Sequence, residues 1–349
     1  MVAVTGSVGK TSTKDIIASA LSQKYNVLKT EGNNNNHIGL PLTVLKLDNQ
    51  EAMVVEMGMN HFGEIRTLTN IAKPTICVIT NIGTSHIGIL GSRENILKAK
   101  LEILEGMQEG GTVIINNDND LLNKWAKENS DKYNIVTYGI ENPSDYTAYN
   151  IKESEENVKY NIKIQNNEYE VTVPVSGKAF VYNSLSAIAV SMKTGLSIPE
   201  AIKGIAEFKL TKKRMEIIKQ GGITIINDSY NASYDSMKAA IEYLKTTNGK
   251  RKIAVLGDML ELGEFGQELH EKVGEEVSKN NIDELITVGN LAKHIAAKAK
   301  EMGMNNIRTF LDNESAANYI KSMLKPDDVI LLKASNSMRF GEILEKIIK

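Results

Sequence analysis

The chain has 349 residues, of which 42% are hydrophobic and 24% are charged, and its formal net charge is -2. This length exceeds the usual size of one hydrophobic core, so we expect two domains, and the composition excludes a disordered or fibrous protein. Acidic and basic residues are mixed along the chain, which argues against a nucleic-acid-binding protein.

The sequence carries no sign of export or membrane insertion. The single cysteine, Cys77, lies in an apolar run and cannot pair within the chain, as is typical of a reducing compartment. No apolar stretch approaches the roughly 20 residues that cross a bilayer, and the N-terminus does not read as a secretory signal. We therefore expect a cytoplasmic protein without membrane contact, and we expect a monomer.

The first part of the chain alternates short β-branched runs with amphipathic segments. Strands are predicted at residues 2–4, 53–56, 75–80 and 112–115. Helices are predicted at residues 14–24 and 94–107. This alternation is typical of a mainly parallel sheet with crossover helices. At residues 146–175 the pattern changes to a period of two, which predicts antiparallel strands at the sheet edge.

The second part repeats the alternation after a polar stretch. A helix is predicted at residues 181–194, and residues 210–213 are the candidate linker. Strands are then predicted at residues 223–227, 253–256, 285–288, 307–310 and 329–332. We therefore predict an α/β protein with a first domain at residues 1–210 and a Rossmann-like C-terminal domain at residues 211–349.

The strongest local signal is the sequence VAVTGSVGKTS at residues 2–12, which predicts a strand, a turn and a helix. Gly6 and Gly9 let backbone N–H groups face a phosphate, and Lys10 supplies a mobile charge for the β- and γ-phosphates. Thr11 places a hydroxyl where a phosphate-bound Mg²⁺ would lie. Only the second half of the general P-loop pattern is matched, and a structural turn is the alternative, but the context predicts a P-loop domain.

Polar side chains also follow two other predicted strands. Glu56 ends a buried strand at the edge where ligands of parallel sheets bind, so it is either a hard oxygen ligand for Mg²⁺ or an exposed acid. His61 and His86 follow strand ends as well. Each could position a cation, and a surface or internally hydrogen-bonded histidine is the alternative for each.

Together these segments resemble the Mur ligases of peptidoglycan synthesis, most closely the branch that adds D-alanyl-D-alanine. The resemblance covers almost the entire chain. In the first half it is carried by TGSVGKT at 5–11, NNNN at 33–36, IGLPLT at 38–43, EMG at 56–58, NIG at 81–83 with His86, GSRENI at 91–96 and AKLEI at 99–103. In the second half it is carried by RME at 214–216, DSYNA at 228–232 and LGDMLELGE at 256–264 with His270.

The resemblance implies a two-step ligase reaction. ATP phosphorylates a substrate carboxylate, and the amine of a dipeptide attacks the acyl phosphate to form a peptide bond. It implies ATP and Mg²⁺, with two metal sites, as cofactors. It implies UDP-N-acetylmuramoyl-tripeptide and D-alanyl-D-alanine as substrates.

The resemblance also implies a role for individual residues. Those expected to be catalytic are Lys10, Lys100, His86 and Arg214. Those expected to bind the nucleotide are Gly6, Ser7, Gly9, Lys10, Thr11, Ser12, Asn183, Arg214 and Asp228. Those expected to hold metal are Thr11, Glu56, His86 and Lys100, the last as a carbamylated lysine. Those expected to bind the acceptor substrate are Asn231, Lys333 and Ser335. From spacing alone, Lys100 would be an ordinary lysine on a helix surface.

The sequence departs from the family pattern at several places. Residues 178–180 are Lys-Ala-Phe where the family has a His-Asn pair, Tyr234 replaces a proline, and Ala334 replaces a glycine. If that glycine has a positive φ, an alanine would cost stability or shift the loop. The family's uridine-binding N-terminal domain has no counterpart, so we expect a fragment, a late gene start or a two-domain variant.

Two other functions fit parts of the sequence. One is a Mur-type ligase of another substrate, such as a folylpolyglutamate or cyanophycin synthetase, although residues 257–263 match the D-alanyl-D-alanine branch better. The other is a nucleotide-binding module without ligase activity, as the departures at residues 333–335 and the lacking domain suggest. A simple NTPase or a dinucleotide oxidoreductase fits less well, because no Gly-x-Gly-x-x-Gly sequence follows an early strand.

Overall fold

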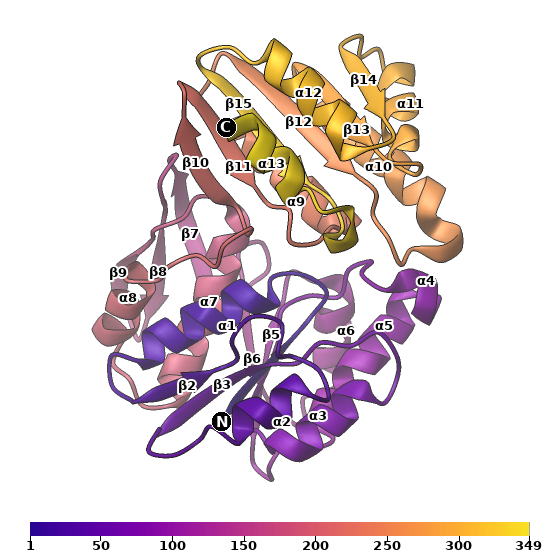
Figure 1. Cartoon of the computed structure of the whole chain (residues 1–349). Helices are drawn as coiled ribbons and strands as arrows, with labels where there is room; N and C mark the ends of the chain where they lie inside the picture. Colours follow the sequence, from indigo (N-terminus) through magenta and orange to yellow (C-terminus); the bar gives the residue numbers. More distant parts are fainter. Residues whose placement is uncertain (349) are drawn as a thin grey trace. The chain divides into compact units, whose positions relative to one another are not determined.

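The computed structural model describes residues 1–348, which fall into two compact units (Figure 1). The first unit comprises Met1–Gly83 and Leu90–Lys209, and the second comprises Thr84–Ile89 and the described residues from Leu210 onward. Each unit has its own sheet with surrounding helices, which confirms the predicted α/β class. None of the helices in residues 1–348 is both long and apolar enough to span a bilayer.

The first unit is built on a nine-stranded sheet in the order β2-β3-β1-β4-β5-β6-β7-β8-β9. Its strands are β1 (Val2–Thr5), β2 (Val27–Lys29), β3 (Ala52–Glu56), β4 (Ile76–Ile79), β5 (Thr112–Asn116), β6 (Asn134–Gly139), β7 (Tyr146–Glu153), β8 (Val158–Ile164) and β9 (Asn167–Val173). Neighbouring strands from β2 to β7 pair in parallel, whereas β8 runs antiparallel to β7 and β9. The predicted parallel sheet with an antiparallel edge is therefore confirmed.

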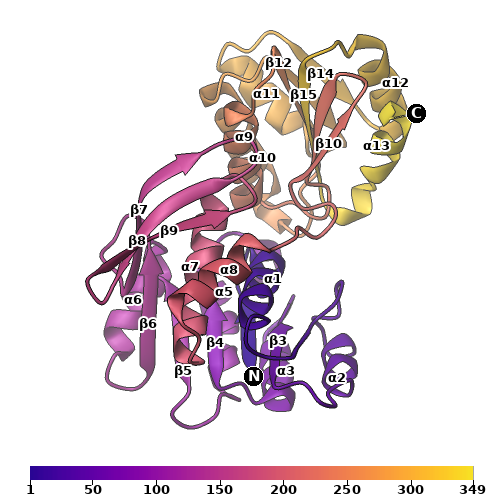
Figure 2. The same ribbon diagram turned by 90° about the vertical axis from the view of Figure 1, so that its left-hand side faces the viewer.

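The helices of the first unit form two groups. One group is α1 (Lys10–Leu21), α7 (Lys178–Lys193) and α8 (Ile198–Ala206), which pack against one another side by side (Figure 2). The other helices are α2 (Gly39–Val44), α3 (Glu64–Ala72), α5 (Arg93–Leu101) with the 3₁₀ turn η1 (Glu102–Leu104), and α6 (Asp120–Asn129). Ile16, Ile17 and Leu21 of α1 are fully buried, so burial of its apolar residues holds this helix in place.

The first helix begins earlier than its apolar pattern predicts. We expected it to begin at residue 14, but α1 begins at Lys10. The preceding residue, Gly9, has a φ of 82°, a left-handed conformation that glycine adopts readily. The chain therefore turns at Gly9 and enters the helix at once, so that the first helical turn carries the residues of the phosphate loop.

The second unit is built on a six-stranded sheet in the order β10-β11-β15-β12-β13-β14. Its strands are β10 (Glu216–Gln220), β11 (Ile223–Asn227), β12 (Arg251–Gly257), β13 (Glu284–Val288), β14 (Ile307–Phe310) and β15 (Asp328–Lys333). All neighbours pair in parallel except the β10–β11 hairpin. All five predicted strands are present, and the doubly wound, Rossmann-like class is confirmed.

Helices and short turns connect the strands of the second unit. They are α9 (Tyr234–Thr246), η2 (Gly263–Phe265), α10 (Gly266–Lys279), α11 (Lys293–Glu301), α12 (Asn313–Met323), η3 (Asn336–Met338) and α13 (Gly341–Ile348). The core of this unit contains Ile253, Val255, Ile286, Ile330 and Leu332, all on central strands. The short helix α4 (Ile87–Leu90) begins in the segment Thr84–Ile89, which clusters with this unit although it lies far earlier in the chain.

Candidate nucleotide and metal site

The loop between β1 and α1 has the backbone that a phosphate loop requires. Gly6 has a φ of 145° and Gly9 a φ of 82°, both in the range that favours glycine. A Cβ atom placed on Gly6 would lie 1.9 Å from Oγ1 of Thr80, closer than any packing allows. Glycine is therefore required at position 6 for two reasons. The backbone there has a positive φ, and Thr80, which follows β4, lies too close for a side chain.

We predict that Gly6→Ala destabilises the first unit by about 2 kcal/mol or more, because the methyl group must displace Thr80 and the φ is strained. Thermal unfolding of the variant measures the loss. The matched control is Gly110→Ala, because Gly110 also has a positive φ (72°) but nothing lies within 4 Å of an added Cβ. Equal stability losses in the two variants would show that the contact with Thr80 has no role.

The two residues that follow β4, Thr80 and Asn81, fix the shape of the loop. Asn81 Oδ1 accepts the N–H of Val8 at 3.0 Å, and Asn81 Nδ2 donates to the carbonyl of Val8 at 3.2 Å. Thr80 Oγ1 donates to the same carbonyl at 2.6 Å. Asn81 belongs to the NIG motif at residues 81–83, and no pattern in the sequence predicts a role for it. The structure shows that its carboxamide holds Val8 by both the N–H group and the carbonyl of that residue.

Lys10 lies folded across its own loop. Its Nζ donates to the carbonyl oxygens of Gly6 at 2.8 Å and of Ser7 at 3.3 Å. A lysine held here is a mobile cation at the start of a helix, where anions are favoured. Ser12 follows in the same first turn and is half-buried. The predicted phosphate-binding residues therefore lie together in one loop.

Thr11 and Glu56 form a buried pair next to this loop. Thr11 Oγ1 donates to Glu56 Oε2 at 2.8 Å, and the two residues are 5% and 2% exposed. Hard oxygen atoms beside a phosphate loop fit Mg²⁺, which commonly takes one or two carboxylates together with phosphate oxygens. Within residues 1–348, no group of three or more His, Cys, Asp and Glu side chains is arranged to hold a metal alone. A cation here would take its other ligands from nucleotide and water.

Lys100, in the last turn of α5, is not the surface lysine that spacing alone suggests. It is 1% exposed, and burial together with the charge of Lys10 lowers the pKa of its amine well below the usual value. A buried ammonium is costly, so this position favours the neutral amine over the cation. Carbamylation of a lysine requires a neutral amine, and the environment of Lys100 is of the kind that favours it.

Asn183 of α7 lies beside the phosphate loop. Its Oδ1 accepts a hydrogen bond from Thr13 Oγ1 at 3.0 Å and lies 3.2 Å from the position of a Cβ on Gly9. Phe180, at the departure from the family's His-Asn pair, is 5% exposed and packs against Phe208. The departure therefore adds to the core of the unit.

His86 lies in the segment Thr84–Ile89, which belongs to the second unit. Its Nδ1 lies 2.8 Å from Oε2 of Glu261, and this contact lowers the pKa of the Glu261 carboxyl. Thr84 in the same segment donates its N–H and its hydroxyl to Asp235 Oδ2 at 2.8 and 2.9 Å. Of the predicted metal ligands, Thr11, Glu56 and Lys100 thus lie in the first unit and His86 in the second.

The second unit brings together Arg214, Asp228, Asn231 and Lys333. The guanidinium of Arg214 lies 3.8 Å above the ring of Tyr230, a stacked cation–π contact. Asp228 Oδ1 accepts the N–H of the residue after Arg214 at 3.1 Å. Lys333, which is buried, donates to Asp228 Oδ2 and to the carbonyl of Asn231. Asp228 and Asn231 follow β11, and Lys333 ends β15. Arg214 precedes β10, whose first residue pairs with the last residue of β11, so all four residues lie at the edge where ligands of parallel sheets bind.

The replacement of a family glycine by Ala334 causes no backbone strain. Ala334 is buried and is not among the residues with positive φ in the described chain, 1–348. Room for its methyl group comes from Gly257, where an added Cβ would lie 2.7 Å from that of Ala334. The next residue, Ser335, accepts the N–H of Leu260 at 2.9 Å through its hydroxyl.

Two family models match the chain, the Mur ligase middle domain over residues 4–191 and the Mur ligase, glutamate ligase domain over residues 213–336. The chain belongs to the Mur ligase family. The UDP-N-acetylmuramoyl-tripeptide--D-alanyl-D-alanine ligase of Bacillus subtilis (strain 168) is 42% identical over 100% of this chain and 76% of its own length. The enzyme of that name from Escherichia coli (strain K12) is 34% identical over 99% of this chain and 76% of its own length.

Solved structures of Mur ligases match the chain as well. MurF from Acinetobacter baumannii matches this Mur ligase with a TM-score of 0.92 and 29% identity, over 99% of this chain and 76% of that one. MurF ligase from Thermotoga maritima in complex with ADP matches with a TM-score of 0.88 and 30% identity, over 99% and 78% of the two chains. The likeness extends through both units of the Mur ligase.

A buried histidine supports the loop after β12 in this Mur ligase. His270 Nε2 accepts the N–H of Met259 at 2.9 Å, and its Nδ1 donates to the carbonyl of Gly266 at 2.6 Å. The ring must therefore be neutral, with its proton on Nδ1. Burial lowers its pKa from the usual 6.5. A second proton would remove the acceptor of the Met259 N–H group.

We predict that the stability of the second unit falls as the pH drops below 6.5, because the unfolded chain then binds a proton at His270 that the folded unit excludes. The contribution of neutral His270 to stability is fully present above pH 6.5. It is lost as the pH falls toward the pKa that His270 has in the folded unit. Thermal unfolding of the wild type and of His270→Gln, between about pH 7.5 and about pH 5, measures it. If stability depends on pH equally in the wild type and in His270→Gln, the assignment of this dependence to His270 is contradicted.

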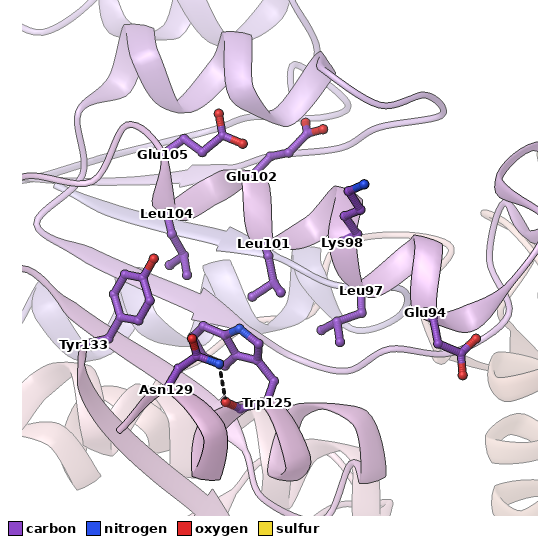
Figure 3. A pocket seen from close by; sticks show the side chains of 10 residues that line it. All are labelled: Glu94, Leu97, Lys98, Leu101, Glu102, Leu104, Glu105, Trp125, Asn129 and Tyr133. Carbon is purple, nitrogen blue, oxygen red and sulfur yellow. Dashed lines mark hydrogen bonds between the residues drawn. The ribbon is translucent and has the colours of Figure 1, made fainter. Parts of the chain in front are cut away.

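A pocket of about 390 Å³ opens between α5 and α6 on the first unit of the Mur ligase. Leu97, Leu101 and Leu104 point toward Trp125 in it, while Glu102 points away from the ring (Figure 3). The Glu102 carboxylate accepts backbone N–H groups at the start of α3. None of the predicted site residues lines this pocket, so it is separate from the nucleotide site.

Proposed function

We propose that the chain catalyses the ATP-dependent addition of D-alanyl-D-alanine to UDP-N-acetylmuramoyl-tripeptide in peptidoglycan precursor synthesis. The observation that carries this proposal is 42% identity, over the whole chain, to a Bacillus subtilis enzyme named for that reaction. The phosphate loop with its buried Thr11–Glu56 pair supplies the chemistry that the reaction needs. A cytoplasmic location fits the single cysteine, Cys77, which is buried and forms no disulfide.

In the first step, a carboxylate oxygen of the tripeptide attacks the γ-phosphorus of ATP, and the bond to the ADP oxygen breaks. The Lys10 ammonium leaves the carbonyls of Gly6 and Ser7 and stabilises the negative charge on the phosphoryl group during its transfer. The backbone N–H groups of the loop hold the remaining phosphates. Thr11 and Glu56 would hold Mg²⁺, which neutralises negative charge on the phosphate oxygens.

In the second step, the amine of D-alanyl-D-alanine attacks the acyl carbon. The carbon–nitrogen bond forms, phosphate leaves with the former carboxylate oxygen, and the amine loses a proton. An acyl phosphate is hydrolysed if water reaches it, so the residues around it must exclude water. We propose that Asn231, Lys333 and Ser335 form part of the acceptor site, with Lys333 acting through its contacts with Asp228 and Asn231.

We propose that Lys100 carries a carbamate and, with His86, holds a second Mg²⁺. The neutral amine attacks CO₂, a nitrogen–carbon bond forms, and one proton leaves the nitrogen, so that a neutral side chain becomes an anion. Burial and the low pKa of the amine support this step, and the nearby charge of Lys10 favours the anionic product. Asn183, Arg214 and Asp228 are proposed to contact adenine, the γ-phosphate and ribose.

The proposal is tested by incubating the chain with ATP, Mg²⁺, UDP-N-acetylmuramoyl-tripeptide and D-alanyl-D-alanine. Mass spectrometry of the nucleotide product and release of phosphate are the readouts. Because the chain spans 76% of the Bacillus subtilis relative, a second arm uses the chain fused to the uridine-binding domain expected from the family. ATP binding without ligation in either arm would favour a nucleotide-binding module. Ligation of glutamate instead of the dipeptide would favour a Mur-type ligase of another substrate.

A further inference from the structure

The asparagine run at residues 33–36 contacts the end of β3 through Asn35. Asn35 Nδ2 donates to Glu56 Oε1 at 2.9 Å, and the carbonyl of Asn35 accepts the N–H of Gly58 at 2.9 Å. Asn35 is therefore attached to the segment around Glu56 by both its backbone and its side chain. Hydrogen bonding between a neutral amide and a carboxylate is stronger than between two neutral groups, so this contact orients the carboxylate.

Gly58 provides the space for the Asn35 carboxamide. A Cβ atom on Gly58 would lie 3.1 Å from Cγ, Nδ2 and Oδ1 of Asn35, a contact tighter than ordinary packing. An alanine here would push the amide group aside by a few tenths of an ångström. The hydrogen bond to Glu56 thus depends on two residues, which can be changed independently.

Both oxygen atoms of Glu56 are engaged, and by different donors. Oε2 accepts from Thr11 Oγ1 at 2.8 Å and Oε1 accepts from Asn35 at 2.9 Å, on a carboxylate that is 2% exposed. A cation that approaches beside Thr11 meets Oε2, while the Asn35 amide holds Oε1. Chelation by both oxygens would therefore compete with the Asn35 hydrogen bond.

The difference between one and two oxygen ligands separates Mg²⁺ from Ca²⁺. Mg²⁺ requires a near-octahedral shell at short distances, whereas Ca²⁺ accepts a larger, flexible shell in which carboxylates often bind through both oxygens. We propose that Asn35 is a specificity-determining residue, which restricts Glu56 to one metal-facing oxygen and so favours Mg²⁺ over Ca²⁺ in the nucleotide complex. This inference rests on the proposed function, since it requires a nucleotide-bound cation at Thr11 and Glu56.

Calorimetric titration of ADP into the chain, with Mg²⁺ or with Ca²⁺ as the only divalent cation, tests the inference without any turnover. The readout is the ratio of the two dissociation constants. In Asn35→Ala we expect the dissociation constant with Ca²⁺, divided by that with Mg²⁺, to fall by about tenfold. Most of this change should come from tighter binding of ADP with Ca²⁺. The matched control is Asn33→Ala, because Asn33 belongs to the same run and is exposed, and its ratio is expected to equal that of the wild type.

Gly58→Ala tests the same hydrogen bond from the other side, with Asn35 itself unchanged. Gly58→Ala is expected to lower the ratio of the two dissociation constants as Asn35→Ala does. If Asn35→Ala does not fold, the Gly58→Ala variant alone tests the inference. Ratios within about twofold of the wild type in the folded variants would overturn the inference. A wild-type chain that binds no nucleotide with either cation would instead contradict the proposed function, so the two failures are distinguishable.

Discussion

Replacing Lys10 by alanine is expected to slow ligation by roughly a hundredfold to a thousandfold, because the charge that follows the transferred phosphoryl group is removed. Lys10 is half-buried and its Nζ donates to carbonyl oxygens of its own loop, so we expect the variant still to fold. The initial rate of product formation at saturating ATP is the measurement. Because the missing interaction is strongest in the transition state, the loss should be seen mainly in kcat.

The control for this variant is Lys132→Ala, since Lys132 is an exposed lysine of the same unit. Its rate is expected to match the wild type. A Lys10→Ala protein that keeps more than half of the wild-type rate would contradict the role given to this residue. Its thermal unfolding, measured in parallel, separates loss of chemistry from loss of fold.

Replacing Lys100 by methionine is expected to slow ligation by about tenfold to a hundredfold, because the group proposed to assist metal placement is removed. Methionine is apolar and of similar length, so it suits a position that is 1% exposed. In the wild type, removal of dissolved CO₂ should slow the reaction and added bicarbonate should restore it. In the variant neither treatment should change the rate.

Carbamylation itself is detected by a carbon NMR signal after incubation with ¹³C-bicarbonate. The signal is expected in the wild type and absent from Lys100→Met. Lys98→Met is the matched control, because Lys98 lies on the same helix but is exposed, and both its signal and its rate should equal those of the wild type. A wild-type rate that does not respond to CO₂, with no carbamate signal, would contradict the modification.

Much of the fold could be predicted because its signals are local. The strand runs of both units are continuous apolar segments, and the TGSVGKT motif contains its own turn, charge and hydroxyl within seven neighbouring positions. Three strands were not predicted. Of these, β2 (Val27–Lys29) and β10 (Glu216–Gln220) lie at sheet edges, whereas β6 (Asn134–Gly139) lies inside the first sheet between β5 and β7. Edge strands are half-exposed, so their polar residues weaken the apolar pattern.

Other parts of the site depend on contacts between distant segments. Helical spacing placed Lys100 on a surface, because spacing cannot show which face of α5 the sheet covers. Asn35 acquires its role from Glu56, 21 positions away, and Asn81 from Val8, 73 positions away. The placement of His86 beside Glu261 joins segments that no local pattern connects. Such residues could be identified only from the folded chain.

The central claim, that the phosphate loop passes a phosphoryl group to a carboxylate, is tested most directly with isotopic oxygen. The tripeptide substrate is labelled with ¹⁸O in its reacting carboxylate, and the phosphate released during ligation is analysed by mass spectrometry. We predict that each phosphate carries one labelled oxygen from the substrate. Phosphate that contains only unlabelled oxygen, taken from ATP and water, would show that the chain hydrolyses ATP without forming an acyl phosphate.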